Sequence, residues 1–291
     1  MTAWIRTCFV ITALAACGHR AGNTPDAPAG DPDAAIGDGG ITGDGGVTGD
    51  GGVTGDAPNS SVCDPAGPQC SNCKDDDNDG RTDGFDPECT GAADNDESSF
   101  ATGIHGDNMD PVMQDCFFDG DSGAGNDGCN IHICCLLGAT SQATCPIGAN
   151  RYDPASCPPP IGTTAIPQQC IDTCGKLTPP GCDCFGCCTI CDPATNECHD
   201  IVLNPEDSTG CDLSTIGDPT KCLACTKNTQ CGSPTCGGET CVLCPGQDPA
   251  DLPASCGGSS MCPEGSPSCT SDAACGELAY CANGCCIGVI F

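Results

Sequence analysis

Cysteine is the residue type that most constrains this chain. The 291-residue sequence contains 34 cysteines, and only Cys8 and Cys17 precede residue 63. Such a density is typical of scaffolds held together by disulfides, which form outside the reducing cytosol. The chain also has 41 Gly and 25 Pro but only 7 Phe, 2 Tyr and 1 Trp, so it lacks the side chains for a large apolar core. We therefore predict small disulfide-rich modules, dominated by loops, with short β-strands and little helix.

The charge of the chain limits its partners. The sequence has 8 Lys and Arg against 40 Asp and Glu, which gives a formal net charge of -32 at pH 7. Nucleic acids and anionic bilayers are bound through clustered Lys and Arg, so this composition excludes nucleic acid and excludes membrane adhesion through surface charge. Divalent cations are the partners that such a chain favours. For acidic residues outside the loop described below, simple solubility is the alternative.

The N-terminus has the pattern of an export signal. Residues 1–17 read MTAWIRTCFVITALAAC, in which one Arg precedes an apolar run too short to span a bilayer. The last four residues, Leu14 to Cys17, resemble the lipobox of bacterial lipoproteins. That resemblance implies cleavage before Cys17, acylation of this residue and a stable lipid anchor in the cell envelope. Gly18 resembles the sorting signal for the outer membrane of Gram-negative bacteria; an ordinary cleaved signal is the alternative.

Composition divides the rest of the chain into four segments. Residues 18–62 lack cysteine and repeat the hexad ITGDGG, VTGDGG, so we predict a disordered Gly/Asp-rich tether that holds the body away from the membrane. Residues 63–130 form an acidic block, which we predict to be a calcium-binding module. Residues 131–220 form a dense Cys-rich module. Residues 221–291 contain an internal repeat, because CTKNTQCG from Cys225 recurs as CTSDAACG from Cys269.

The repeat predicts two small disulfide knots of the same design. The cysteines expected to form disulfides there are Cys225, Cys231, Cys236 and Cys241 in the first copy, and Cys269, Cys275, Cys281 and Cys285 in the second. Sequence alone does not give the connectivity. Adjacent cysteines, as in Cys134-Cys135, are expected to reach different partners. Short strands are expected at Asn130 to Leu137 and at Asp200 to Leu203, where β-branched residues gather.

The stretch KDDDNDGRTDGFDPEC, residues 74–89, fits the coordination chemistry of calcium. A calcium loop of twelve residues supplies oxygen ligands from positions 1, 3, 5, 7, 9 and 12 and has Gly at position 6. Counted from Asp75, Gly80 occupies the glycine position. The ligands are then Asp75, Asp77, Asp79, the backbone carbonyl of Arg81, Asp83 and Asp86.

The same stretch resembles the calcium loops of dockerins and thrombospondin type 3 repeats. It is less similar to an EF-hand, because Asp86 replaces the usual Glu and Pro87 and Cys89 follow where a helix would be needed. Cys73 and Cys89 bracket the loop, so a nearby disulfide is expected to hold it shut. Because extracellular calcium loops commonly bind with a Kd of about 10⁻⁴ to 10⁻³ M, we expect a structural ion; a plain acidic linker is the alternative.

Other candidate sites are weaker. Asp119, Asp121 and Asp127 form a second acidic cluster, whose spacing fits no complete loop. The run CDCFGCCTIC is compatible with a soft-metal cluster, although oxidative export favours disulfides, and His132 is a possible ligand beside cysteines.

These features favour a function without catalysis. No carboxylate pair, catalytic triad or complete metal centre is recognisable, so we do not predict an enzyme. The arrangement resembles Cys-rich bacterial surface lipoproteins. We predict an exported, lipid-anchored, calcium-binding surface protein with a structural, adhesive or binding role, whose partner is an extracellular protein or polysaccharide. The alternative is a secreted protease inhibitor or toxin-like binder that acts through the C-terminal knots.

Overall fold

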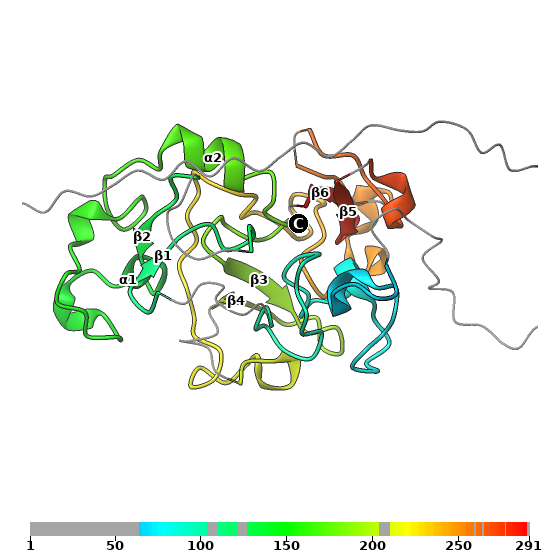
Figure 1. Ribbon diagram of the computed structural model, residues 1–291, viewed down its shortest axis with the longest axis horizontal. Helices are drawn as coiled ribbons and strands as arrows, with labels where there is room; N and C mark the ends of the chain where they lie inside the picture. Colours follow the sequence, from blue (N-terminus) through cyan, green and yellow to red (C-terminus); the bar gives the residue numbers. More distant parts are fainter. Residues whose placement is uncertain are drawn as a thin grey trace, which may run out of the picture. The chain divides into compact units, whose positions relative to one another are not determined.

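The computed structural model describes residues 64–103, 110–120, 127–203, 210–258, 260–263, 265–276 and 278–289. The predicted signal peptide, with Cys17, and the predicted tether lie outside these residues. Figure 1 shows how little of the described chain is helix or strand. None of the helices in the described ranges is long and apolar enough to cross a membrane.

The strands form three separate antiparallel pairs (Figure 1). Strand β1 (Met113–Gln114) pairs with β2 (Ile131–His132), β3 (Cys187–Cys191) pairs with β4 (Cys198–Val202), and β5 (Ala279–Ala282) pairs with β6 (Cys285–Gly288). The two α-helices are α1 (Ile133–Leu136) and α2 (Gln168–Cys174). The 3₁₀ turns are η1 (Gln69–Ser71), η2 (Asp83–Phe85), η3 (Gln142–Thr144), η4 (Pro154–Ser156), η5 (Leu213–Thr215), η6 (Pro249–Asp251), η7 (Ala254–Cys256) and η8 (Asp272–Ala274). The fold is therefore loop-dominated, as the composition predicts.

Disulfides take the place of a large apolar core. Every cysteine among the described residues is disulfide-bonded, and half-cystines make up much of the main buried clusters, beside aromatic residues such as Tyr152 and Phe185. Helix α2 shows how they work. Its buried Cys170 and Cys174 lie four residues apart, on one face of the helix, and pair with Cys129 and Cys116. Such a bonded network requires an oxidising environment, which places the folded chain outside the reducing cytosol.

Adjacent cysteines reach different partners, as predicted. Cys134 pairs with Cys145, while Cys135 pairs with Cys157. The same separation holds for the other two vicinal pairs, whose bonds are Cys187–Cys225, Cys182–Cys188, Cys262–Cys285 and Cys275–Cys286.

The strand expected over Asn130 to Leu137 is only partly present. Strand β2 ends at His132, and the four-residue helix α1 follows. The expectation was therefore wrong for Asn130 and for residues 133–137. Successive side chains of a strand point to opposite faces, whereas both sulfurs of the Cys134-Cys135 pair must reach the segment that follows. The expected strand at Asp200 to Leu203 corresponds to β4, which spans Cys198–Val202.

The two copies of the C-terminal repeat do not share a disulfide pattern, so the prediction of two knots of the same design is wrong in this respect. In each copy, the first two cysteines form disulfides with a β-hairpin region. The hairpin bonded to the first copy comes earlier in the sequence than that copy, whereas the hairpin bonded to the second copy comes later. The first copy bonds backward, to Cys184 and Cys187 at the start of the β3–β4 hairpin. The second copy bonds forward, to Cys281 and Cys286 within the β5–β6 hairpin.

Covalent links also cross both of the boundaries drawn from composition. Bonds Cys116–Cys174 and Cys129–Cys170 cross residue 130, and bonds Cys184–Cys231 and Cys187–Cys225 cross residue 220. The division at 130 and 220 therefore remains a description of composition, because the segments on either side are joined by disulfides.

Candidate metal centre

The first half of the acidic loop brings three carboxylates together. Oxygen atoms of Asp75, Asp77 and Asp79 lie within 4.8 Å of one another. Calcium binds oxygen at 2.3–2.6 Å, so two ligands on opposite sides of one ion are about 5 Å apart. The three carboxylates are thus close enough together to share one cation.

The backbone of the loop has the bend that the sequence predicts. Gly80 has a φ of 96° and Asn78 a φ of 65°, both in the left-handed region that these two residue types tolerate best. The bend lets the loop amides point back at the carboxylates: Gly80 N donates to Asp75 Oδ2 at 3.1 Å, and Arg81 N donates to Asp79 Oδ1 at 2.8 Å. These hydrogen bonds hold the carboxylates in place around the same point.

Asp86 is the most unusual carboxylate in the loop. Its side chain is only 1 % exposed, and its Oδ1 accepts a hydrogen bond from Glu88 N at 2.7 Å. Its Oδ2 is buried and has no hydrogen-bond partner in the structure. Burial, together with the nearby charge of Asp79, raises the pKa of Asp86 to about 8. A buried oxygen with no partner is costly, and either a bound proton or a cation would satisfy it.

Asp83 has a different environment from the one that the twelve-residue pattern implies. Its Oδ1 accepts from Asn72 N at 3.0 Å, and its Oδ2 accepts from Cys73 N at 3.0 Å. Cys73 has a φ of 60° and lies in a turn. Its backbone amide therefore has no partner in a helix or strand and takes Asp83 as its acceptor. Asp83 therefore anchors the loop to the segment before it.

Glu97 lies outside the twelve-residue pattern, but its side chain also binds backbone amides of the loop. It is fully buried, and its two carboxylate oxygens accept from Asp76 N at 2.6 Å and from Asp83 N at 2.9 Å. Sequence reasoning missed this residue, because nothing in the spacing of a calcium loop marks a glutamate twenty-one residues after Asp76. Its acidic neighbourhood, DNDE, was the only signal.

A disulfide closes the loop, as predicted. Cys89 pairs with Cys70, at a sequence separation of 19 residues, and Cys73 is also disulfide-bonded. The loop is fixed as well to the C-terminal block. Arg81 Nη2 lies 3.6 Å from Asp248 Oδ2 and donates to the carbonyl of Gly246, while Asn283 N donates to the carbonyl of Gly84.

The second acidic cluster is only partly described. Oxygen atoms of Asp119 and Asp127 lie within 4.8 Å of each other and of the sulfur of Cys116, which is bonded to Cys174. Asp127 Oδ1 accepts from Cys129 N, and its buried Oδ2 has no partner in the structure. Asp121 lies outside the described residues. The metal site at this cluster stays a prediction.

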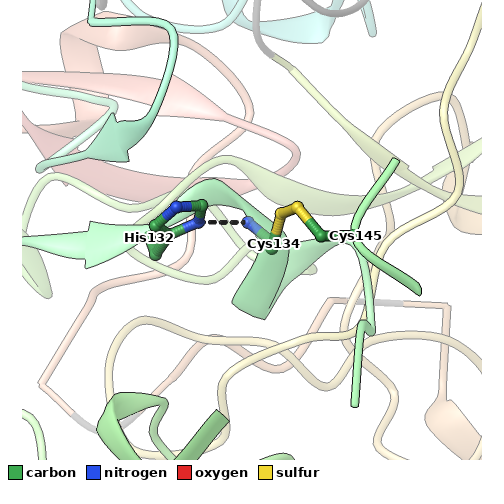
Figure 2. Close-up of side chains that lie close together, drawn as sticks. All are labelled: His132, Cys134 and Cys145. Carbon is green, nitrogen blue, oxygen red and sulfur yellow. Dashed lines mark hydrogen bonds between the residues drawn. A yellow bond between two sulfur atoms is a disulfide. The ribbon is translucent and has the colours of Figure 1, made fainter. Parts of the chain in front are cut away.

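The histidine beside the cysteines does not form a thiolate site. Figure 2 shows His132 next to Cys134 and Cys145, whose sulfurs are bonded to each other. The Nδ1 atom of His132 accepts a hydrogen bond from Cys134 N at 3.1 Å and so caps helix α1 (Figure 2). Burial lowers the pKa of His132. Because the sulfurs are oxidised, this cluster offers a soft metal no thiolate ligand.

Comparison with known proteins found no match among protein-family models, curated proteins or solved structures.

Proposed function

We propose that this chain is an exported, lipid-anchored surface protein. In this proposal the acidic loop binds calcium, and the disulfide-bonded part of the chain has a structural or adhesive role. The observation that carries the calcium proposal is the convergence of Asp75, Asp77 and Asp79 in a loop that also holds the buried, unpartnered oxygen of Asp86. All of these ligands are hard oxygen donors, which calcium prefers to softer metals.

The ion's role is structural in this proposal. The loop is closed by Cys70–Cys89, and within described residues 64–103 it has only the short 3₁₀ turns η1 and η2 and no longer helix that could move. A bound cation would offset the repulsion among the loop carboxylates and so favour the folded state. The lipid anchor at Cys17 is proposed from the lipobox alone.

Mass spectrometry of the full chain tests both parts. The protein is isolated from the membrane fraction of its host under non-reducing conditions, and its mass is measured with calcium and after chelation. We expect added acyl mass at Cys17 and a bound calcium that chelation removes.

Two variants serve as controls. Cys17→Ser is expected to lose the acyl mass and leave the membrane fraction, and Asp86→Asn is expected to lose calcium but keep the acyl mass. An unmodified Cys17 in the membrane-derived protein would contradict the anchor. A parent chain that takes up no calcium at millimolar concentrations would contradict the metal site.

A secreted inhibitor or toxin-like binder is the second candidate. It is favoured by two large apolar side chains in the C-terminal block, Met261 and Leu278, which are 61 % and 68 % exposed. Met261 directly precedes Cys262, which is bonded to Cys285 in strand β6, so a disulfide links this position to the β5–β6 hairpin. Inhibition of proteases by the full chain, lost on Leu278→Ser substitution, distinguishes this candidate from a structural role.

A further inference from the structure

Asp127 is a buried residue whose carboxylate has one oxygen without a partner. The residue is only 5 % exposed. Its Oδ1 accepts a hydrogen bond from Cys129 N at 2.9 Å, whereas its Oδ2 is buried and has no hydrogen-bond partner in the structure. Buried polar atoms are rarely left unsatisfied in folded proteins, because they have lost their hydration and gained nothing in return. The Oδ2 atom of Asp127 therefore indicates that a further group binds beside it.

A disulfide to helix α2 holds this carboxylate in place. Asp127 lies two residues before Cys129, which is bonded to the buried Cys170 of α2. On the same helix, Thr173 Oγ1 lies 3.5 Å from the backbone carbonyl oxygen of Asp127. The backbone at Asp127 is therefore fixed to α2, and the hydrogen bond from Cys129 N sets the orientation of the carboxylate.

A second carboxylate lies beside it. An oxygen of Asp119, an oxygen of Asp127 and the sulfur of Cys116 lie within 4.8 Å of one another. Asp119 lies three residues after Cys116, whose disulfide to Cys174 fastens this segment to the same helix α2. The sulfur is oxidised, so the cluster offers a metal no thiolate, and its ligands are the two carboxylates. Two carboxylates that are fixed to one helix are thus close enough together to share a cation.

We propose that Asp119 and Asp127 bind a hydrated divalent cation of the magnesium class. Two carboxylates supply fewer oxygens than the six to eight that calcium takes, whereas Mg²⁺ is commonly held by one or two carboxylates and keeps several of its waters. The ion gives Asp127 Oδ2 its missing partner. The site shares no ligand with the proposed calcium loop, so it stands independently of that proposal. Asp121, which the sequence groups with these residues, is not part of it.

A proton on the carboxylate pair is the alternative partner for Asp127 Oδ2. The two possibilities differ in the effect of divalent cations. A cation site binds metal and loses that binding when residue 127 is neutral. A bound proton leaves no metal binding at this position, and Asp127→Asn then mimics the protonated form, because the amide supplies a donor. Asn also keeps an acceptor for Cys129 N, so this substitution preserves the hydrogen bond that orients the side chain.

Binding of Mn²⁺ to the full, disulfide-intact chain tests the proposal. Mn²⁺ takes the same carboxylate and water ligands as Mg²⁺, and electron paramagnetic resonance measures how much of it stays free. Every chain in the test carries Asp77→Asn, which removes a ligand of the proposed calcium loop. We expect this background chain to bind Mn²⁺ and excess Mg²⁺ to displace it. Adding Asp127→Asn is expected to weaken the binding by about tenfold or more, since loss of a residue that only orients a ligand already costs about tenfold.

Asp172→Asn is the matched control for charge. Asp172 lies on α2 between Cys170 and Cys174, but it is exposed and accepts from Gln168 Nε2 at 2.9 Å. This variant removes the same charge from the same helix region and is expected to change the affinity for Mn²⁺ by less than about threefold, because exposed charges are screened. Thermal unfolding without added metal checks that each variant folds like the background chain.

Binding that is weakened by Asp127→Asn and kept in Asp172→Asn supports the site. The inference is overturned by a background chain that binds no Mn²⁺, by equal affinity with and without Asp127→Asn, or by an equal loss in Asp172→Asn. Bound Mn²⁺ that excess Mg²⁺ does not displace also overturns it. Should Asp127→Asn fail to fold, Asp119→Asn, at the half-buried residue of the pair, decides by the same criterion. The calcium loop is tested separately, in the parent chain.

Discussion

Asp183 is a buried carboxylate that accepts hydrogen bonds from three backbone amides. Its Oδ1 accepts from the amides of Phe185 and Cys187, and its Oδ2 accepts from Asn228 N at 2.7 Å. It therefore joins the dense Cys-rich segment to the first copy of the C-terminal repeat. Asp183→Asn replaces one acceptor with a donor, and we expect it to lower the free energy of unfolding by about 1–3 kcal/mol. Denaturant unfolding of the disulfide-intact chain measures this change.

Asp192 provides the control for that substitution. It also accepts from an amide two residues later, Ala194 N at 2.8 Å, but in an exposed turn. Water can replace the lost acceptor there, so Asp192→Asn is expected to change the free energy of unfolding by less than about 0.5 kcal/mol. Equal losses for the two variants would show that burial of Asp183 is not what makes it important.

The residues of the candidate site were predictable only where local spacing decides the geometry. The αL positions of Asn78 and Gly80 and the convergence of Asp75, Asp77 and Asp79 follow from a contiguous pattern. The anchoring role of Asp83 and the support from Glu97 depend on amides that the fold brings near, some of them distant in sequence. Spacing contains no information on such contacts.

Among elements, the turn η2 and the β5–β6 hairpin approach each other at Gly84. A Cβ atom on this glycine would lie 2.3 Å from the carbonyl oxygen of Cys281 and 2.8 Å from the ring of Tyr280. Backbone atoms cannot move aside as the end of a flexible side chain can. Gly84→Ala must therefore push η2 away from the β5–β6 hairpin. We expect a loss of about 1–3 kcal/mol in the free energy of unfolding, measured by denaturant titration.

Gly91→Ala is the matched control, because a Cβ there meets nothing within 4 Å. It is expected to be neutral or slightly stabilising, since Ala restricts the unfolded chain more than Gly does. If Gly84→Ala is as stable as Gly91→Ala, the hairpin does not pack against η2 as described.

The sequence predicts the class of the fold but not which cysteines pair. Cysteine content and the scarcity of aromatic residues dictate a loop-rich, disulfide-stapled fold with short strands. The partners of Cys225 and Cys231 lie in an earlier hairpin, whereas those of Cys269 and Cys275 lie in a later one. The similar spacing of cysteines in the two copies gives no reason for this difference, because connectivity follows from which hairpin is in reach after folding.

At the scale of the whole molecule, the acidic block (residues 63–130) contains buried carboxylates, and burial opposes their ionisation. Burial raises the pKa of Asp94 to about 8 and that of Glu97 to about 7, from ordinary values of 3.8 and 4.5. Between about pH 4 and pH 8 the folded chain therefore holds protons that the unfolded chain has released. In the absence of calcium, the free energy of unfolding must fall as the pH rises through this interval.

Calcium should oppose that trend. The ion requires ionised ligands, so it binds more tightly as the pH rises, and at ten to a hundred times its Kd it adds about 1.4–2.7 kcal/mol to the free energy of unfolding. We expect the unfolding temperature in calcium-free buffer to be lower at pH 8 than at pH 5, and the difference to shrink in excess calcium. Asp94→Asn should flatten the calcium-free slope, while Glu239→Gln, at an exposed position, should leave it unchanged. An unfolding temperature that rises from pH 5 to pH 8 without calcium would contradict the burial of these carboxylates, because carboxylates with a raised pKa in the folded state give a fall, and exposed acids with ordinary pKa values are already ionised and give no slope.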